Sequence, residues 1–148
     1  MLRINDQELN EIRKFGELDY PYECCGLMIG TFNQDGSKNV SETYAISNSR
    51  EEEARRNRFL ITPDELIRGE RYARSKELDV VGLYHSHPDA PAVPSQYDLD
   101  HAWPAYSYII VSVVEKKATD LFSWEMEPDR SQFKKEEMIV SSPAQAEL

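Results

Sequence analysis

Tyr84-His85-Ser86-His87-Pro88, followed after a loop of six residues by Ser95-Gln96-Tyr97-Asp98, is the most informative stretch of this sequence. The apolar run from Asp79 to Tyr84 predicts a buried strand that ends at the first of these segments. Alternate side chains of a strand point to the same face, so we expect both histidines to aim at one point while Ser86 faces away. A helix that begins at Ser95 would bring Asp98 to the same point. Two imidazoles and one carboxylate leave one position of a tetrahedral zinc ion open, so the sequence predicts a zinc site of the catalytic kind.

Each of these residues also has an ordinary structural interpretation. A lone histidine is more often structural than a metal ligand, although two on one strand face favour metal binding. Ser95-x-x-Asp98 is a helix-capping pattern, in which the serine accepts a backbone hydrogen bond and the aspartate lies at the positive end of the helix. The two roles of Asp98 are compatible, because an aspartate in the first turn of a helix is held rigidly.

A hydrolytic zinc site also needs a general base for the attacking water and a donor for the oxyanion. Glu23 precedes a mainly apolar run and is the candidate base; a solvent-exposed carboxylate at a strand edge is its structural alternative. Ser95 is the candidate oxyanion donor, and its structural alternative is the helix cap alone.

The length and composition indicate one globular domain. A chain of 148 residues can form one hydrophobic core but is too short for two domains of ordinary size. The longest apolar run, Tyr108 to Val114, is far shorter than the roughly 20 residues that span a bilayer, and the polar N-terminal segment is unlike a signal peptide. We therefore expect a cytoplasmic protein without a membrane partner.

The charge and the cysteines exclude further classes. The formal net charge of -10 argues against a nucleic-acid partner, because nucleic-acid-binding proteins usually carry a basic surface. Cys24 and Cys25 are neighbours and the only cysteines, so no disulfide framework and no Cys-x-x-Cys metal site is expected. They lie in an apolar run, which predicts small buried residues rather than a catalytic thiol.

The remaining pattern predicts an α/β fold of alternating strands and helices. Thr62-Pro63-Asp64-Glu65 is the strongest local signal, because it combines a threonine cap, a proline in the first turn and a capping-box glutamate. We expect helices over 6–18, from 62 to about 76 and from Ser95. Strands are expected over 24–32, 40–46, 58–61, 79–84, 106–114 and 121–126, with an edge strand within 133–140. The segment 47–58 is expected to be an exposed loop. Residues 1–140 are expected to form the domain and 141–148 a loose tail.

His85-Ser86-His87-Pro88 with Ser95-x-x-Asp98 resembles the signature of the JAMM metallopeptidases, the catalytically competent MPN domains. Upstream, Pro21-x-Glu23-x-Cys25-Gly26-Leu27-x-x-Gly30 resembles the segment that brings the catalytic glutamate in the small stand-alone prokaryotic members. The resemblance covers roughly residues 5–126, and every position of the metal motif is filled.

The resemblance implies a fold, a site and a substrate class. It implies a mixed sheet flanked by helices and related to cytidine deaminases. His85, His87 and Asp98 would be the zinc ligands, Glu23 the general acid–base, and Ser95 the donor to the tetrahedral oxyanion. Members of the family cleave peptide or isopeptide bonds after the C-terminal Gly-Gly of ubiquitin-like proteins, and the small prokaryotic members resemble processing enzymes for ubiquitin-like sulfur carriers.

Two other functions are compatible with the sequence. One is a zinc peptidase that acts on a different peptide, and the other is a non-catalytic MPN scaffold that only binds partners. A nucleobase deaminase is disfavoured, because its His-x-Glu and Pro-Cys-x-x-Cys motifs do not occur.

Overall fold

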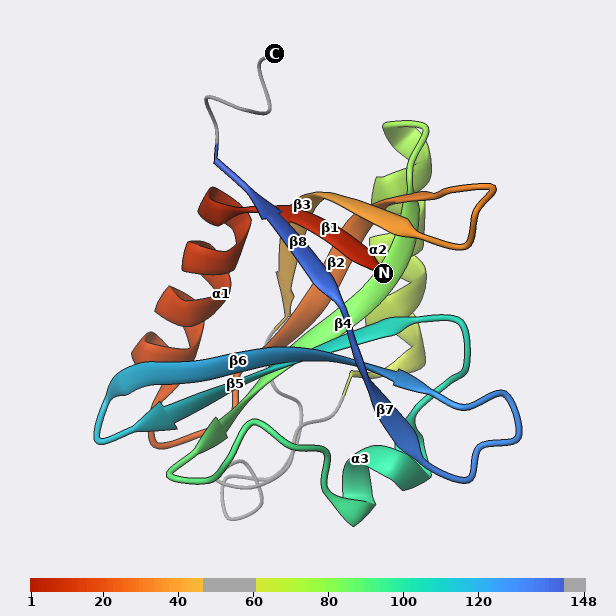
Figure 1. Ribbon diagram of the computed structural model, residues 1–148. Helices are drawn as coiled ribbons and strands as arrows, with labels where there is room; N and C mark the ends of the chain where they lie inside the picture. Colours follow the sequence, from red (N-terminus) through yellow and green to blue (C-terminus); the bar gives the residue numbers. More distant parts are fainter. Residues whose placement is uncertain (47–60, 143–148) are drawn as a thin grey trace.

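The structure is a computed structural model that describes residues 1–46 and 61–142, and within them the chain forms three helices and a mixed sheet of eight strands (Figure 1). The elements follow one another as β1 (Leu2–Asn5), α1 (Asp6–Asp19), β2 (Cys25–Phe32), β3 (Lys38–Ile46), α2 (Pro63–Ser75), β4 (Asp79–Pro88), α3 (Gln96–His101), β5 (Ser107–Val114), β6 (Lys117–Met126), β7 (Phe133–Glu136) and β8 (Met138–Ser141).

Local capping signals set where the helices begin. The Asn5 side chain accepts a hydrogen bond from the amide of Glu8 and caps α1. Thr62 and Glu65 form the reciprocal hydrogen bonds of a capping box at the start of α2. These bonds satisfy N–H groups that have no partner inside the helix, so short polar motifs fix the start of both long helices.

The sheet has the strand order β7-β6-β5-β4-β2-β3-β1-β8, with β4 antiparallel to β2 and parallel to β5. Its two edge strands, β7 and β8, are separated in the chain by Glu137 alone. The segment therefore passes from one edge of the sheet to the other, as the continuous blue strand in Figure 1 shows. The sheet is curved, so that strands far apart in this order meet. Nζ of Lys38 of β3 lies 3.2 Å from Glu125 of β6 and 3.5 Å from Glu136 of β7.

The two long helices cover opposite faces of the sheet (Figure 1). Ile12 of α1 belongs to a core cluster that includes Tyr84 of β4, while Ala73 of α2 belongs to a second cluster that is joined by Leu83. Neighbouring residues of β4 thus face different helices. The face that carries Leu83 also carries His85 toward the cavity described below.

The predicted α/β class and most of its elements are confirmed, with corrections to the strands. β4 does not end at Tyr84 but continues to Pro88, because β5 pairs with it as far as Val113. The single edge strand expected within 133–140 is two strands at opposite edges of the sheet, and β1 was not predicted.

Some expectations fall outside the described residues. The exposed loop over 47–58 and most of the strand over 58–61 lie there, and Ile61 itself is not in a strand. The division into a domain over 1–140 and a tail over 141–148 stays a prediction. None of the helices in 1–46 and 61–142 is long and apolar enough to cross a membrane.

Candidate metal centre

His85 and His87 converge with Asp98 at the end of β4. The Nε2 atoms of the two histidines are 3.1 Å apart. Asp98 reaches them from α3, with Oδ1 at 3.3 Å from Nε2 of His85 and Oδ2 at 3.2 Å from Nε2 of His87. All three side chains are buried, with exposed fractions of 1%, 8% and 8%. The structure thus brings together the three predicted ligand residues.

Glu23 approaches the same histidine pair from the start of β2. One ligand atom each of Glu23, His85 and His87 lies within 4.8 Å of the others. The two histidines can therefore bind a cation together with the carboxylate of Asp98 or that of Glu23. In a tetrahedral site with metal–nitrogen bonds of about 2.0 Å, neighbouring ligand atoms lie about 3.3 Å apart, and the spacing around His85, His87 and Asp98 is close to that value.

In the neutral form of His87, hydrogen bonding places the ring proton on Nδ1 and leaves the metal-facing nitrogen free. Nδ1 of His87 lies 2.8 Å from the carbonyl oxygen of Pro91, which only accepts, so Nδ1 carries a proton. In the neutral ring the lone pair of Nε2 then points toward His85 and a carboxylate oxygen of Asp98. Acceptor atoms this close repel one another unless a proton or a metal ion lies among them, and a backbone carbonyl on the other nitrogen is typical of metal-binding histidines. The residues present fit a metal ion.

The loop between β4 and α3 is fixed by bonds from the neighbouring strands. Ser112 of β5 donates to the carbonyl oxygen of Ala90 at 2.6 Å, and the indole N–H of Trp124 of β6 donates to that of Ala92 at 3.1 Å. With the bond from His87 to Pro91, three consecutive carbonyl groups of the loop are held. The loop therefore returns the chain to the histidines in a defined position.

Asp98 and Ser95 form the capping box of α3. The amide of Asp98 donates to Oγ of Ser95 at 3.1 Å, and the amide of Ser95 donates to Oδ2 of Asp98 at 2.8 Å. The cap holds the carboxylate in place, which confirms that capping and a position beside the histidines are compatible. The Ser95 hydroxyl acts only as an acceptor in this bond, so its own proton stays available for donation.

Ser86 ties the start of β2 to β4. Its side chain points away from the histidines, as predicted, and its Oγ accepts the amide of Cys24 at 2.8 Å. The amide of Ser86 donates in turn to the carbonyl oxygen of Cys24 at 3.2 Å. Glu23 directly precedes Cys24, so this pair of bonds fixes where the Glu23 backbone lies relative to the histidines.

Burial controls the protonation of Glu23. The residue is 2% exposed, so the strand-edge position in solvent that was its alternative interpretation is wrong. Burial raises the pKa of Glu23 to about 8, with His87 opposing the change and Asp98 adding to it. A carboxyl group with a pKa near neutrality can both take up and return a proton.

The pKa values of the two histidines shift in opposite directions, and that of Asp98 is lowered. Burial lowers the pKa of His85 and outweighs the nearby Asp98 carboxylate. The pKa of His87 is raised: burial opposes the change, but the hydrogen bond and charge of Asp98 outweigh it. The pKa of Asp98 is held well below its usual range, because the two histidines and the Ser95 amide outweigh burial.

The two cysteines are buried and reduced, and burial raises the pKa of Cys24 to about 12 and raises that of Cys25. A thiol held neutral in this way is a poor nucleophile. The prediction that these are small buried residues is confirmed.

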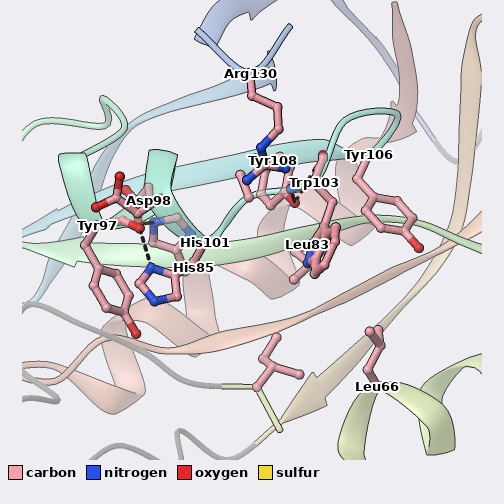
Figure 2. Close-up of a pocket in the computed structure, with 13 residues that line it drawn as sticks. Leu66, Leu83, His85, Tyr97, Asp98, His101, Trp103, Tyr106, Tyr108 and Arg130 are labelled. Atoms are coloured by element: carbon pink, nitrogen blue, oxygen red, sulfur yellow. Dashed lines mark hydrogen bonds and ion pairs between the residues drawn. The ribbon is translucent and has the colours of Figure 1, made fainter. Parts of the chain in front are cut away.

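A cavity of about 340 Å³ opens beside the candidate metal centre and includes His85 and Asp98 in its wall. Figure 2 shows Tyr97, Asp98, His85 and His101 at one end of this cavity and Trp103, Tyr108 and Arg130 toward the other. Sequence reasoning missed Arg130 and Trp103, because only the fold brings their segments to α3. It also missed the Ser86 bond to Cys24, although a serine between two histidines on a buried strand is a signal that could have been used.

Comparisons with known proteins agree with this geometry. Residues 6–127 match the family described as prokaryotic homologs of the JAB domain. The chain is 33% identical over 108 residues to a desampylase from Haloferax volcanii, which covers 72% of this chain and 74% of that protein. Among solved structures, a protein from Desulfitobacterium hafniense matches with a TM-score of 0.82 and 26% identity, over 96% of this chain and 94% of that chain. A JAB1/MPN domain protein from Archaeoglobus fulgidus has the same fold, with a TM-score of 0.56 and 18% identity over 94% of this chain and 98% of that one.

Proposed function

This chain belongs to the family of prokaryotic homologs of the JAB domain, and we propose that it is a zinc-dependent peptidase that cleaves after the C-terminal Gly-Gly of a ubiquitin-like or sulfur-carrier protein. The observation that carries the proposal is the convergence of two buried histidines, an aspartate and a buried glutamate at one wall of a cavity. The similarity to a desampylase supports hydrolysis of a bond to a protein modifier.

In this proposal His85, His87 and Asp98 hold the zinc ion. When bound, the ion supplies a Lewis acid that polarises the scissile carbonyl group and lowers the pKa of a water molecule. The Pro91 carbonyl keeps the proton of His87 on Nδ1, and the α3 cap keeps the Asp98 carboxylate in place. These contacts keep the three donor groups preorganised.

Glu23 is the general base and acid. It accepts the proton of the attacking water as the carbon–oxygen bond forms, and it returns a proton to the amine as the carbon–nitrogen bond breaks. Its position supports this role, because Glu23 is buried beside the histidine pair, where its carboxylate can reach a water molecule bound at the site. Ser95 donates its hydroxyl proton to the oxyanion.

The substrate class rests on the family and on the shape of the site. A diglycine tail carries no side chains, so it can approach the buried histidine pair closely. The absence of a disulfide partner for the adjacent cysteines supports a cytoplasmic location.

The test uses a small carrier protein that ends in Gly-Gly plus one additional residue. We expect the zinc-loaded protein to bind one zinc ion per chain and to release the carrier that ends in Gly-Gly, detected by its mass. Glu23→Gln should retain zinc and lose cleavage. Wild-type cleavage rates in Glu23→Gln would contradict the assignment of the base.

Two alternatives correspond to other outcomes of this test. A protein that takes up no zinc after reconstitution would be a non-catalytic scaffold. A zinc-loaded protein that cleaves unrelated short peptides, but not the carrier, would be a peptidase for another substrate.

A further inference from the structure

The cavity beside the candidate metal centre has features that a Gly-Gly tail does not use. Its walls are largely apolar and aromatic. They include Leu66 of α2, Leu83 of β4, Trp103 and Tyr106 from the segment before β5, and Tyr108 of β5. Two glycines offer no side chain to these walls. The cavity therefore suits a different part of the substrate.

Charge is distributed unevenly over the same cavity. Asp98 and Asp100 of α3 lie in its wall, and Arg130 is the single lysine or arginine among the described residues that line it. In Figure 2 Arg130 reaches down from the connection between β6 and β7 toward Tyr108 and Trp103, apart from the group formed by His85 and Asp98. Its guanidinium group lies 6.0 Å from the ring centre of Trp103.

Arg130 makes no ion pair with any carboxylate in the described part of the chain, although the sequence contains 27 acidic residues against 17 lysines and arginines. Its guanidinium group is therefore available to a ligand. Arginine pairs well with carboxylates, because two of its N–H groups match the two oxygen atoms.

Hydrolysis after Gly-Gly gives a leaving segment whose chemistry matches this arrangement. The bond between the glycine carbonyl carbon and nitrogen breaks, a bond to water oxygen forms, and the leaving nitrogen departs with the proton that it receives. Its new amino group arises beside the Asp98 end of the cavity. If the leaving segment is short, its terminal carboxylate lies toward the opposite end, where Arg130 stands.

We propose that Arg130 binds the terminal carboxylate of a short leaving segment and that the apolar walls bind its side chains. This inference rests on the proposed function and narrows it, because it favours C-terminal extensions of a carrier over isopeptide conjugates. In an isopeptide conjugate the leaving group is a lysine side chain of a folded protein, and it brings no terminal carboxylate to Arg130.

Hydrogen bonds fix the backbone at Trp103 and Arg130 and allow a clean test. The amide of Trp103 donates to the buried Tyr108 hydroxyl group at 2.7 Å, which fixes the backbone at Trp103. Arg130 has a φ angle of 63° and its amide donates to the carbonyl oxygen of Glu127 at 2.8 Å. Glycine adopts this φ angle without strain, so Arg130→Gly removes the guanidinium group while favouring the same turn.

The experiment compares carriers that end in Gly-Gly plus one, two or three apolar residues, each made as the free acid and as the C-terminal amide. We expect the wild-type protein to cleave the acid roughly twofold to fivefold faster than the amide at the best length, the size of an ion pair with an exposed arginine. Arg130→Gly should abolish this preference by slowing the acid alone, and Arg130→Lys should keep part of it. Arg74→Gln is the matched control, because Arg74 lines the neighbouring cavity instead and carries the same charge.

A binding measurement complements the rates. In a Glu23→Gln background, calorimetry should show tighter binding of the acid than of the amide, and Arg130→Gly should remove the difference. A conjugate to a lysine side chain should be insensitive to Arg130→Gly.

The outcomes separate this inference from the proposed function. Failure to cleave any of the carriers would overturn the proposed function. Equal cleavage of acid and amide, unchanged in Arg130→Gly, would overturn the inference and leave the function standing. Equal slowing of acid and amide in Arg130→Gly would show that Arg130 binds an acidic side chain of the carrier, and a carrier with those acids neutralised would then lose the sensitivity.

Discussion

At the scale of single residues, Glu23 is a group whose protonation the fold controls strongly. It lies beside two histidines and Asp98 and is 2% exposed, so in the metal-free protein its neutral form is favoured. A bound cation would favour the carboxylate instead. This burial therefore makes the stability of the metal-free protein depend on pH.

The first prediction concerns this pH dependence. Burial raises the pKa of Glu23 from 4.5 to about 8, so between these values the folded protein holds a proton that the unfolded chain releases. The stability from this group is complete below the lower value and is lost as pH rises to the upper one. Relative to Glu23→Gln, metal-free wild type should lose up to about 1.4 kcal/mol per pH unit.

Urea unfolding in the presence of a chelator, at several pH values between 5 and 8, measures this difference. The shifts of the neighbouring histidines are present in both proteins and largely cancel in the comparison. Parallel stability curves for the two proteins would show that Glu23 is charged in the metal-free fold.

Ser95 caps α3 and is the proposed oxyanion donor, and substitutions can separate the two roles. Ser95→Ala removes both the cap of α3 and the hydroxyl donor, Ser95→Asn keeps a capping oxygen but loses the hydroxyl, and Ser95→Thr keeps both. We expect Ser95→Ala to cost about 1 kcal/mol of stability, with Ser95→Asn and Ser95→Thr near wild type.

Cleavage should follow a different order from stability. If Ser95 donates to the oxyanion, Ser95→Ala and Ser95→Asn should both lower kcat by about 100-fold, with Ser95→Thr much less affected. Steady-state kinetics on the Gly-Gly carrier measure this. A kcat that tracked the stability of α3 instead would assign Ser95 to the cap alone.

At the scale of elements, β4 organises the site, because one face carries the histidines and the other binds the backbone next to Glu23. His85 lines the cavity and His87 lies beside it on the same face of β4, while Ser86 faces α1 and accepts a hydrogen bond from the amide of Cys24. An ideal Cβ placed on Gly16 of α1 would lie 3.4 Å from Cβ of Ser86, so the space around this serine is tight.

The third prediction concerns the hydrogen bond from the Cys24 amide to the Ser86 hydroxyl group. Ser86→Ala leaves the buried amide of Cys24 without the hydroxyl acceptor, which should lower the free energy of unfolding by about 1–3 kcal/mol. Because Glu23 precedes this amide, kcat should fall while the zinc content stays at one ion per chain. Ser112→Ala is the comparison, since it loses a hydrogen bond to the loop after β4 without touching β2. Loss of zinc together with kcat in Ser86→Ala would place its effect on the histidines instead of Glu23.

The elements also show what the sequence predicts and what it does not. Thr62-Pro63-Asp64-Glu65 predicts the start of α2 because every interaction of a capping box is local. His85 and His87 could be placed on one face because strand alternation is local as well. The extension of β4 to Pro88 could not be predicted, because it depends on pairing with β5, nor could the split of β7 from β8, because their partners lie at opposite edges of the sheet.

At the scale of the whole molecule, curvature of the sheet determines which distant residues meet. Lys38 of β3 is 3% exposed and lies between Glu125 of β6 and Glu136 of β7, so a buried ion network joins the two halves of the sheet. The same topology brings the connection between β6 and β7 to α3. The residues that form the far side of the cavity are therefore set by the closure of the sheet and carry no local motif.

The last prediction concerns metal binding and global stability. The candidate donors His85, His87 and Asp98 come from β4 and α3, which are brought together only in the folded protein, so a metal ion should bind the native state far more tightly than the unfolded chain. At a free zinc concentration 100-fold above Kd, the stabilisation is about 2.7 kcal/mol. Chelation should therefore lower Tm by several degrees and added zinc should restore it, as scanning calorimetry can measure. His87→Ala should abolish the zinc-dependent shift, while His101→Ala, which alters an exposed histidine of α3, should keep it. A shift that survives in His87→Ala would place the metal ion elsewhere in the protein.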